Sequence, residues 1–148
     1  MTVLLAALLT TPTAHAEAFR GAACNTHSTT LARTESGGGF YNQSTSAMDV
    51  YCAPSTGTYF SALGGTDTMT LYVLDQHYSQ NLSCTFYART TATSYYGSAS
   101  SSGSSSSVSG LSMTATIPVG YYWQYAYCAV PPYYSSSSNY SGVWGGFF

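Results

Sequence analysis

Four aromatic residues stand at alternate positions in one segment: Tyr121, Trp123, Tyr125 and Tyr127. We call them the aromatic row. Alternate side chains of a β-strand point to the same face, so a strand over residues 121–130 would carry these rings at intervals of about 6.8 Å. Exposed rings of this kind stack on sugar rings, and they also form contact points between proteins. The aromatic row is therefore the leading candidate for a functional surface.

The four cysteines bear on the direction in which this row points. Cys24, Cys52, Cys84 and Cys128 form an even set in a small chain, which is typical of two disulfides formed in an oxidising compartment. Three pairings are possible, and we favour Cys24 with Cys52 and Cys84 with Cys128 because these are neighbours along the chain. No Cys-x-x-Cys motif supports a zinc site. We expect no metal and no cofactor.

The faces of the strand over residues 121–130 follow from the second of these pairs. Cys84 alternates with Leu82 and Phe86 on the apolar side of its own strand, so Cys128 should also point into the core. The aromatic row would then point away from the core. A cover over the row remains an alternative, formed by a loop or by the segment that holds Trp144, Phe147 and Phe148.

Catalytic chemistry has little support in the sequence. His27 and His77 remain after the expected leader, and Asp75 and His77 have the spacing of an acid-base or metal pair in a predicted turn. A solvated turn is the favoured interpretation of that pair. No Gly-x-Ser-x-Gly elbow or phosphate-binding loop is present. We expect a non-enzymatic protein with no catalytic residues.

Charged residues are scarce. The chain has 148 residues, of which three are Lys or Arg and five are Asp or Glu, for a net charge of −2. An ordinary domain has roughly a quarter of its residues charged. No basic surface for nucleic acid or anionic lipid can be built from so few cations. The same scarcity removes the charge repulsion and edge lysines that keep β-proteins apart.

The elements that would position the aromatic row are strands. Period-two alternation predicts strands over 48–52, 69–74, 82–88, 111–117 and 121–130, with a further strand within 140–148. We expect 69–74 and 82–88 to form a hairpin, and the segments 17–39 and 90–110 to be loops, the second of them rich in serine. The predicted fold is all-β, an antiparallel β-sandwich of about 6–8 strands with two disulfides, and a closed barrel is the alternative.

An export signal is expected ahead of this domain. Residues 3–9 are an apolar run, and Ala14-His15-Ala16 has the small-x-small pattern that signal peptidase cleaves. The run is shorter than the roughly 20 residues that a transmembrane helix needs. We therefore predict a signal peptide over 1–16, a single domain over 17–148 without a transmembrane segment, and a secreted or cell-surface location.

Short motifs around three of the cysteines resemble small exported bacterial β-rich proteins of uncharacterised function. They are Val-Tyr-Cys-Ala-Pro at 50–54, Leu-Ser-Cys-Thr-Phe at 82–86 and Tyr-Cys-Ala-Val-Pro-Pro at 127–132. The resemblance covers roughly residues 24–143. It implies an exported bacterial β-domain with disulfides at these positions, and it brings no activity or catalytic residues.

Two functions fit these observations. The first is a structural or surface protein, a self-associating subunit of an extracellular fibre, coat or matrix that uses aromatic faces and uncharged strand edges. The alternative is a carbohydrate-binding module that uses the aromatic row. The expected partner is another copy of this chain or a polysaccharide, and not nucleic acid.

Overall fold

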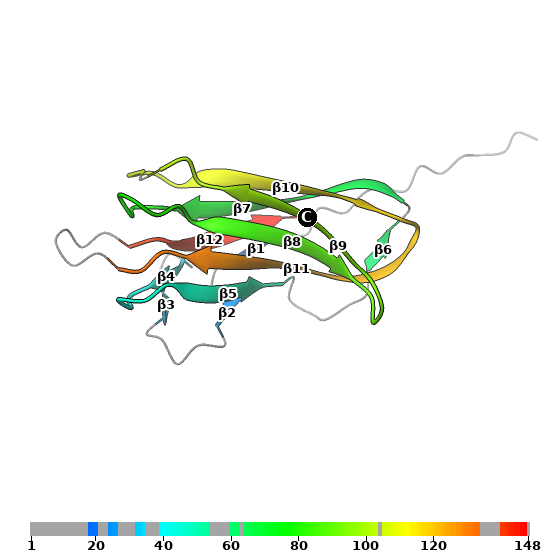
Figure 1. Cartoon of the computed structure of the whole chain (residues 1–148), viewed down its shortest axis with the longest axis horizontal. Coiled ribbons are helices and arrows are strands. Elements are labelled where there is room, and N and C mark those ends of the chain that lie inside the picture. The colour runs from blue at the N-terminus through cyan, green and yellow to red at the C-terminus, as the bar shows by residue number, and fades with distance from the viewer. Residues whose placement is uncertain are drawn as a thin grey trace, which may run out of the picture.

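The computed structural model describes residues 18–20, 24–26, 32–34, 39–53, 60–62, 64–103, 105–133 and 140–147. Within these ranges the chain forms strands and turns but no helix, and two antiparallel sheets pack face to face (Figure 1). The predicted β-sandwich is confirmed. The predicted signal peptide, residues 1–16, lies outside the described residues.

Sheet A has the strand order β10-β7-β12-β4-β3, and β1 pairs with β12. Its strands are β1 (Ala18–Arg20), β3 (Ala32–Thr34), β4 (Phe40–Asn42), β7 (Gly65–Leu74), β10 (Ser109–Ile117) and β12 (Gly142–Phe147). The segment predicted as a loop over 17–39 thus contains short strands. Strands of two or three residues leave no visible alternation, which is why the sequence did not indicate them.

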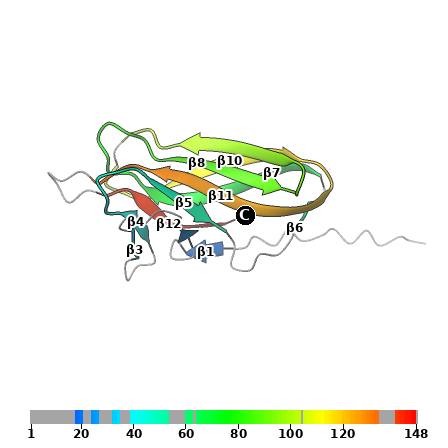
Figure 2. The same ribbon diagram turned by 60° about the horizontal axis from the view of Figure 1, so that its bottom comes forward.

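Sheet B has the order β2-β5-β11-β8-β9, and β6 pairs with the start of β11. Its strands are β2 (Cys24–Asn25), β5 (Met48–Cys52), β6 (Phe60–Ala62), β8 (Ser83–Arg89), β9 (Ser94–Ser100) and β11 (Gly120–Val130). The rotated view in Figure 2 shows β8, β11 and β5 lying together in this layer. The described part of the chain has twelve strands, more than the expected 6–8, and seven of them have five or more residues.

The core lies between the sheets and follows the alternation of the long strands. In β10, the residues Leu111, Met113, Ala115 and Ile117 are buried while the residues between them are exposed. Phe86, Met48, Met69 and Leu71 are among the largest fully buried side chains of the core. Apolar burial of this kind is the main favourable term in folding, so the fold does not need many charged residues.

Both predicted disulfides are present, Cys24–Cys52 and Cys84–Cys128. In each pair the two cysteines lie directly opposite each other on neighbouring strands of sheet B, with 4.1 Å between the Cα atoms. All four are buried in the core. The disulfides indicate that the domain folds in an oxidising environment.

The predicted hairpin between β7 and β8 is wrong. β7 pairs with β10 and β12 in sheet A, whereas β8 pairs with β11 and β9 in sheet B. The segment 75–82 therefore crosses from one sheet to the other. Alternation predicts which face of a strand is buried, but both sheets bury a face in the same core, so it does not say to which sheet a strand belongs.

This crossing is held by the buried carboxylate of Asp75. Its Oδ1 accepts hydrogen bonds from the His77 backbone N–H (3.1 Å) and the Ser141 hydroxyl (2.8 Å). Its Oδ2 accepts from the Leu82 backbone N–H (2.9 Å) and from the Ser101 hydroxyl. Ser101 follows β9 and Ser141 precedes β12, so one carboxylate joins both sheets. A buried charge needs such donors to offset its lost hydration.

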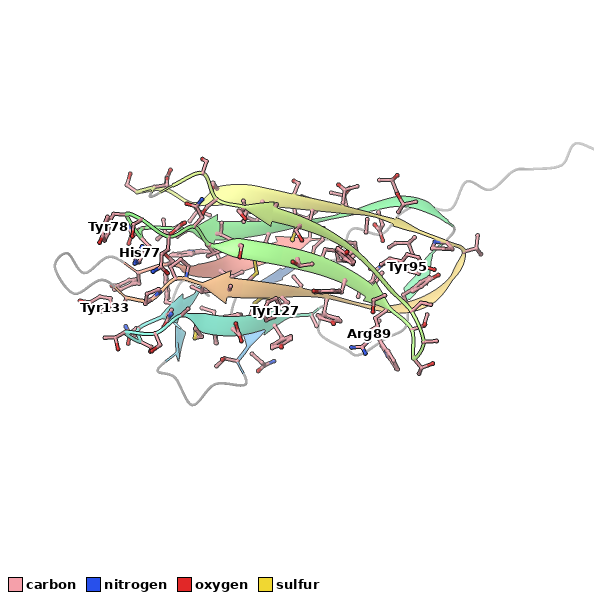
Figure 3. All side chains as sticks on the ribbon, viewed as in Figure 1. His77, Tyr78, Arg89, Tyr95, Tyr127 and Tyr133 are labelled. Atoms are coloured by element: carbon pink, nitrogen blue, oxygen red, sulfur yellow. A yellow bond between two sulfur atoms is a disulfide. The ribbon has the colours of Figure 1, made fainter. Side chains whose placement is uncertain are left out.

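His77 does not lie in the solvated turn that we expected, because its side chain is only 5% exposed. Its Nδ1 accepts hydrogen bonds from the backbone N–H groups of Ser79 (3.3 Å) and Gln80 (3.0 Å). Its hydrogen bond to Asp75 comes from the backbone N–H. Figure 3 shows His77 and Tyr78 at one end of the sandwich. The imidazole thus shapes the turn.

The serine-rich segment over 90–110, predicted as a loop, contains the seven-residue strand β9. This strand lies against β10, so an edge strand of sheet B meets an edge strand of sheet A. At Gly97 the backbones approach so closely that a Cβ atom would lie 1.9 Å from the carbonyl oxygen of Thr114. Contact with β10 therefore requires a glycine here. Such a residue weakens the sequence signal for a strand.

Candidate functional site

The aromatic row lies on β11, and the predicted alternation of this strand is confirmed for the side chains that the structure describes. Trp123, Tyr125 and Tyr127 point away from the core, while the intervening side chains are buried: Tyr122, Gln124, Ala126, Cys128 and Val130. Trp123 is 37% exposed. Tyr121 belongs to β11 by its backbone, and its side chain lies outside the described residues.

Three tyrosines that the sequence analysis did not assign to the site extend the row into a face. Tyr51 of β5, Tyr87 of β8 and Tyr96 of β9 lie opposite one another or opposite row members in the strand register. Ring centroids are 6.1 Å apart for Tyr96 and Tyr87, 5.2 Å for Tyr87 and Tyr125, 6.4 Å for Tyr125 and Tyr51, and 5.2 Å for Tyr51 and Tyr127. We call these five residues the tyrosine chain. Cross-strand aromatic pairs of this kind stabilise a sheet.

A groove of about 530 Å³ opens on this face, and we call it the Trp123 groove. It is lined by the residues Asn25, Tyr51, Ala53, Arg89, Thr90, Thr91, Trp123 and Tyr125. Aromatic rings thus line it together with an amide, a guanidinium and two hydroxyls. Its volume lies in the range of about 300–1,000 Å³ found for small-ligand sites.

The turn between β8 and β9 forms one side of the groove. Thr90 Oγ1 accepts hydrogen bonds from the backbone N–H groups of Ala92 (3.1 Å) and Thr93 (3.0 Å), which fixes this turn. Arg89 is the last residue of β8 and lies opposite Trp123 in the register. Figure 3 shows Arg89 at the end of the sandwich away from His77. A hydrogen-bonding edge is thereby held beside the indole.

Tyr127 and Asp49 form a hydrogen-bonded pair at the middle of the face. The Tyr127 hydroxyl donates to Asp49 Oδ1 over 2.7 Å. This hydrogen bond, with a smaller contribution from burial, raises the pKa of Tyr127 to about 12. The phenol therefore stays protonated at ordinary pH, and its proton points at a carboxylate.

The terminal strand does not cover the aromatic row with the residues that we considered for this role. Trp144 packs against Tyr41 with 4.5 Å between ring centroids, and Phe147 lies 6.0 Å from Tyr72. Trp144 and Phe147 belong to β12 in sheet A. The alternative of a cover is therefore wrong for these two residues, and Phe148 lies outside the described residues.

Some of the site residues that were not predicted could have been identified from the sequence. Tyr51 precedes Cys52 and Tyr87 follows Phe86, so core-facing neighbours already implied that both tyrosines face outward on sheet B. Asn25, Arg89 and Tyr96 are different, because only the strand order of sheet B brings them onto the same face as the aromatic row. No local pattern carries that information.

The described ranges carry neither a cluster of metal ligands nor a membrane-spanning helix. No group of three or more His, Cys, Asp or Glu side chains there could hold a metal ion. No helix in those ranges has the length and apolar character to span a bilayer. No family profile, curated protein or solved structure matches this chain.

Proposed function

We propose that this protein is an exported, non-enzymatic binding domain whose Trp123 groove takes a segment of a neutral polysaccharide. The observation that carries this proposal is a groove of ligand size in which aromatic rings lie beside hydrogen-bonding side chains. A sugar ring presents C–H groups on its faces and hydroxyls around its edge. Trp123, Tyr125 and Tyr51 match the first, and Arg89 and Asn25 match the second.

The groove is sparsely charged, which leaves stacking and neutral hydrogen bonds as its main means of binding. Arg89 is the one cationic side chain among the residues that line the groove. The nearby carboxylate of Asp49 already accepts the Tyr127 hydroxyl. An uncharged sugar is bound through stacking and neutral hydrogen bonds, which salt screens little. We therefore expect affinity that changes little with ionic strength.

The experiment is calorimetric titration of the protein with soluble neutral polysaccharides, with an acidic polygalacturonate as the comparison. Trp123→Ala should weaken binding by about tenfold or more, in the range of a binding hot spot. Tyr72→Ala is the matched control, since Tyr72 is an aromatic residue of similar exposure, 45%, on sheet A. It should bind like the wild type. The proposal fails if no neutral polysaccharide binds, or if Trp123→Ala binds as well as Tyr72→Ala.

Self-association is the second candidate, and the position of Tyr96 favours it. This tyrosine is 67% exposed and extends the aromatic face to the edge strand of sheet B, beyond the groove. β9 and β10 lie against each other, so the aromatic face would carry the contact in place of strand pairing. Sedimentation at high protein concentration tests this, together with Tyr96→Ala. A strictly monomeric wild type would exclude it.

The proposed setting is the cell surface or the extracellular space, with residues 1–16 as the signal peptide. The two disulfides support an oxidising compartment, and both candidate functions fit such a location. N-terminal sequencing of the protein recovered from its native host would test this. Cleavage after Ala16 is the expected result.

A further inference from the structure

The tyrosine chain crosses sheet B without a break. Its members come from β9, β8, β11 and β5, and neighbouring ring centroids are between 5.2 and 6.4 Å apart. Rings at such separations exchange electrons readily once one of them is oxidised. The chain therefore connects the middle of the face to its edge electronically as well as sterically.

One end of the chain has a proton acceptor in place. A phenol that loses an electron becomes a strong acid, so its oxidation is easiest where a base can take the proton. Asp49 Oδ1 lies 2.7 Å from the Tyr127 hydroxyl and accepts its hydrogen bond. Tyr127 is thus prepared for loss of an electron together with its proton.

The other end of the chain is open to solvent. Tyr96 is 67% exposed, whereas Tyr51, Tyr87, Tyr125 and Tyr127 are half-buried. A radical on a half-buried ring has little chance of meeting the ring of a second molecule, but one on Tyr96 can do so. We propose that the outer face of sheet B is an oxidative cross-linking site that joins Tyr96 of one copy to Tyr96 of another.

The reaction balances with hydrogen peroxide as the oxidant and a haem peroxidase as the catalyst. Each of two molecules loses one electron and one proton, and the peroxide is reduced to two waters. The hole passes from Tyr127 along the chain, Tyr127 regains its proton from Asp49, and Tyr96 releases a proton to solvent. The two Tyr96 radicals then form a carbon–carbon bond ortho to their hydroxyls, and the ortho hydrogens move to oxygen to restore two phenols.

The test is treatment of the purified protein with peroxidase and hydrogen peroxide, followed by reducing gel electrophoresis and mass spectrometry of the linked peptides. Tyr78 supplies the matched control, since it is 66% exposed and stands outside the tyrosine chain, stacked on His77. We expect covalent dimers linked through Tyr96, loss of most dimer in Tyr96→Phe, and a wild-type yield in Tyr78→Phe.

A further variant separates the chain from simple exposure. Tyr87→Phe leaves Tyr96 exposed but removes the phenol that connects it to the rest of the chain, so the yield of Tyr96 cross-links should fall clearly. The inference is overturned if Tyr78 and Tyr96 cross-link equally in the wild type, or if Tyr87→Phe has the wild-type yield. Thermal unfolding of each variant verifies that it is folded. The assay contains no polysaccharide, so its outcome is independent of the binding experiment.

Discussion

Among the side chains that the structure describes, the outer faces of the two sheets both carry few charges, yet they are built differently. On sheet A, hydroxyl side chains of β7 stand opposite those of β10, and hydrogen bonds join Thr68 to Thr114 (3.0 Å) and Thr70 to Ser112 (2.9 Å). We call these four residues the hydroxyl ladder. On sheet B, the outward-facing positions of β5, β8 and β11 carry aromatic rings, and the Trp123 groove opens among them.

The difference shows that low charge does not by itself mark a binding surface. The hydroxyl ladder pairs its polar groups with one another and presents short side chains to water. The tyrosine chain presents large rings whose faces are partly exposed, and such patches are typical of recognition sites. Ring placement, and not the lack of charge, distinguishes the proposed functional face.

The largest expected effect concerns the disulfides, both of which lie in sheet B. Replacing Cys84 and Cys128 together with alanine removes a bridge that spans 44 residues. Loop-closure entropy predicts a loss of about 4 kcal/mol in the free energy of unfolding. Guanidinium denaturation measures it. A loss below about 1 kcal/mol would contradict the stabilising role of this bridge.

A smaller effect is expected at the contact between the two sheets. Gly97→Ala would place a Cβ atom 1.9 Å from the Thr114 carbonyl oxygen, so β9 and β10 must move apart. We expect a loss of about 2–3 kcal/mol, as for overpacking. Gly110→Ala on β10 is the control, because a Cβ atom there would lie 3.6 Å from the Thr70 methyl group, an ordinary contact distance. Equal stability of the two variants would contradict the close approach.

The two outer faces should differ modestly when single members are removed. Tyr87→Leu breaks the ring contacts with Tyr96 and Tyr125 and should lower the free energy of unfolding by about 1 kcal/mol. Thr68→Val removes one exposed hydrogen bond of the hydroxyl ladder and should change it by less than about 0.5 kcal/mol. Urea denaturation of both variants tests the order, and a larger loss for Thr68→Val would reverse the comparison.

A further effect is the pH dependence expected from Tyr127 on sheet B. The pKa of Tyr127 is raised from 10.0 to about 12, so the protonated phenol stabilises the fold below pH 10 and this contribution is lost as the pH rises through about 12. Asp49→Asn should lower that pKa toward 10 and remove this loss. Ultraviolet titration of phenolate absorbance measures the pKa. An unchanged titration curve would show that the hydrogen bond to Asp49 does not raise the pKa of Tyr127.

Much of the fold followed from alternation and the cysteines. Placing Cys84 and Cys128 in the core was enough to predict that Trp123, Tyr125 and Tyr127 face outward, because side-chain direction has a period of two. The structure explains the pairing of Cys84 with Cys128, because the two cysteines are cross-strand partners. These are local rules applied to long strands.

What the sequence did not reveal depends on contacts between distant segments. The sequence predicts a loop at β9 because this segment is dominated by serine, contains Gly97 and has little apolar area. In the structure its inward positions are Tyr95, Gly97 and Ala99, and the strand lies close against β10. The role of Asp75 as a junction depends on Ser101 and Ser141, which are 26 and 66 residues away. The groove likewise needs the order of four strands before its lining residues come together.

The positions of the disulfides have a mechanical consequence for sheet B. Cys24–Cys52 clamps β2 to β5 and Cys84–Cys128 clamps β8 to β11, while β5 and β11 are joined by hydrogen bonds and by the ring contacts of Tyr51. A force pulling across the sheet would therefore open the joint between β5 and β11 before either clamp. The Trp123 groove spans this joint, with Tyr51 on one side and Trp123 on the other. A polymer bound in the groove would contact both strands and would resist the opening of this joint.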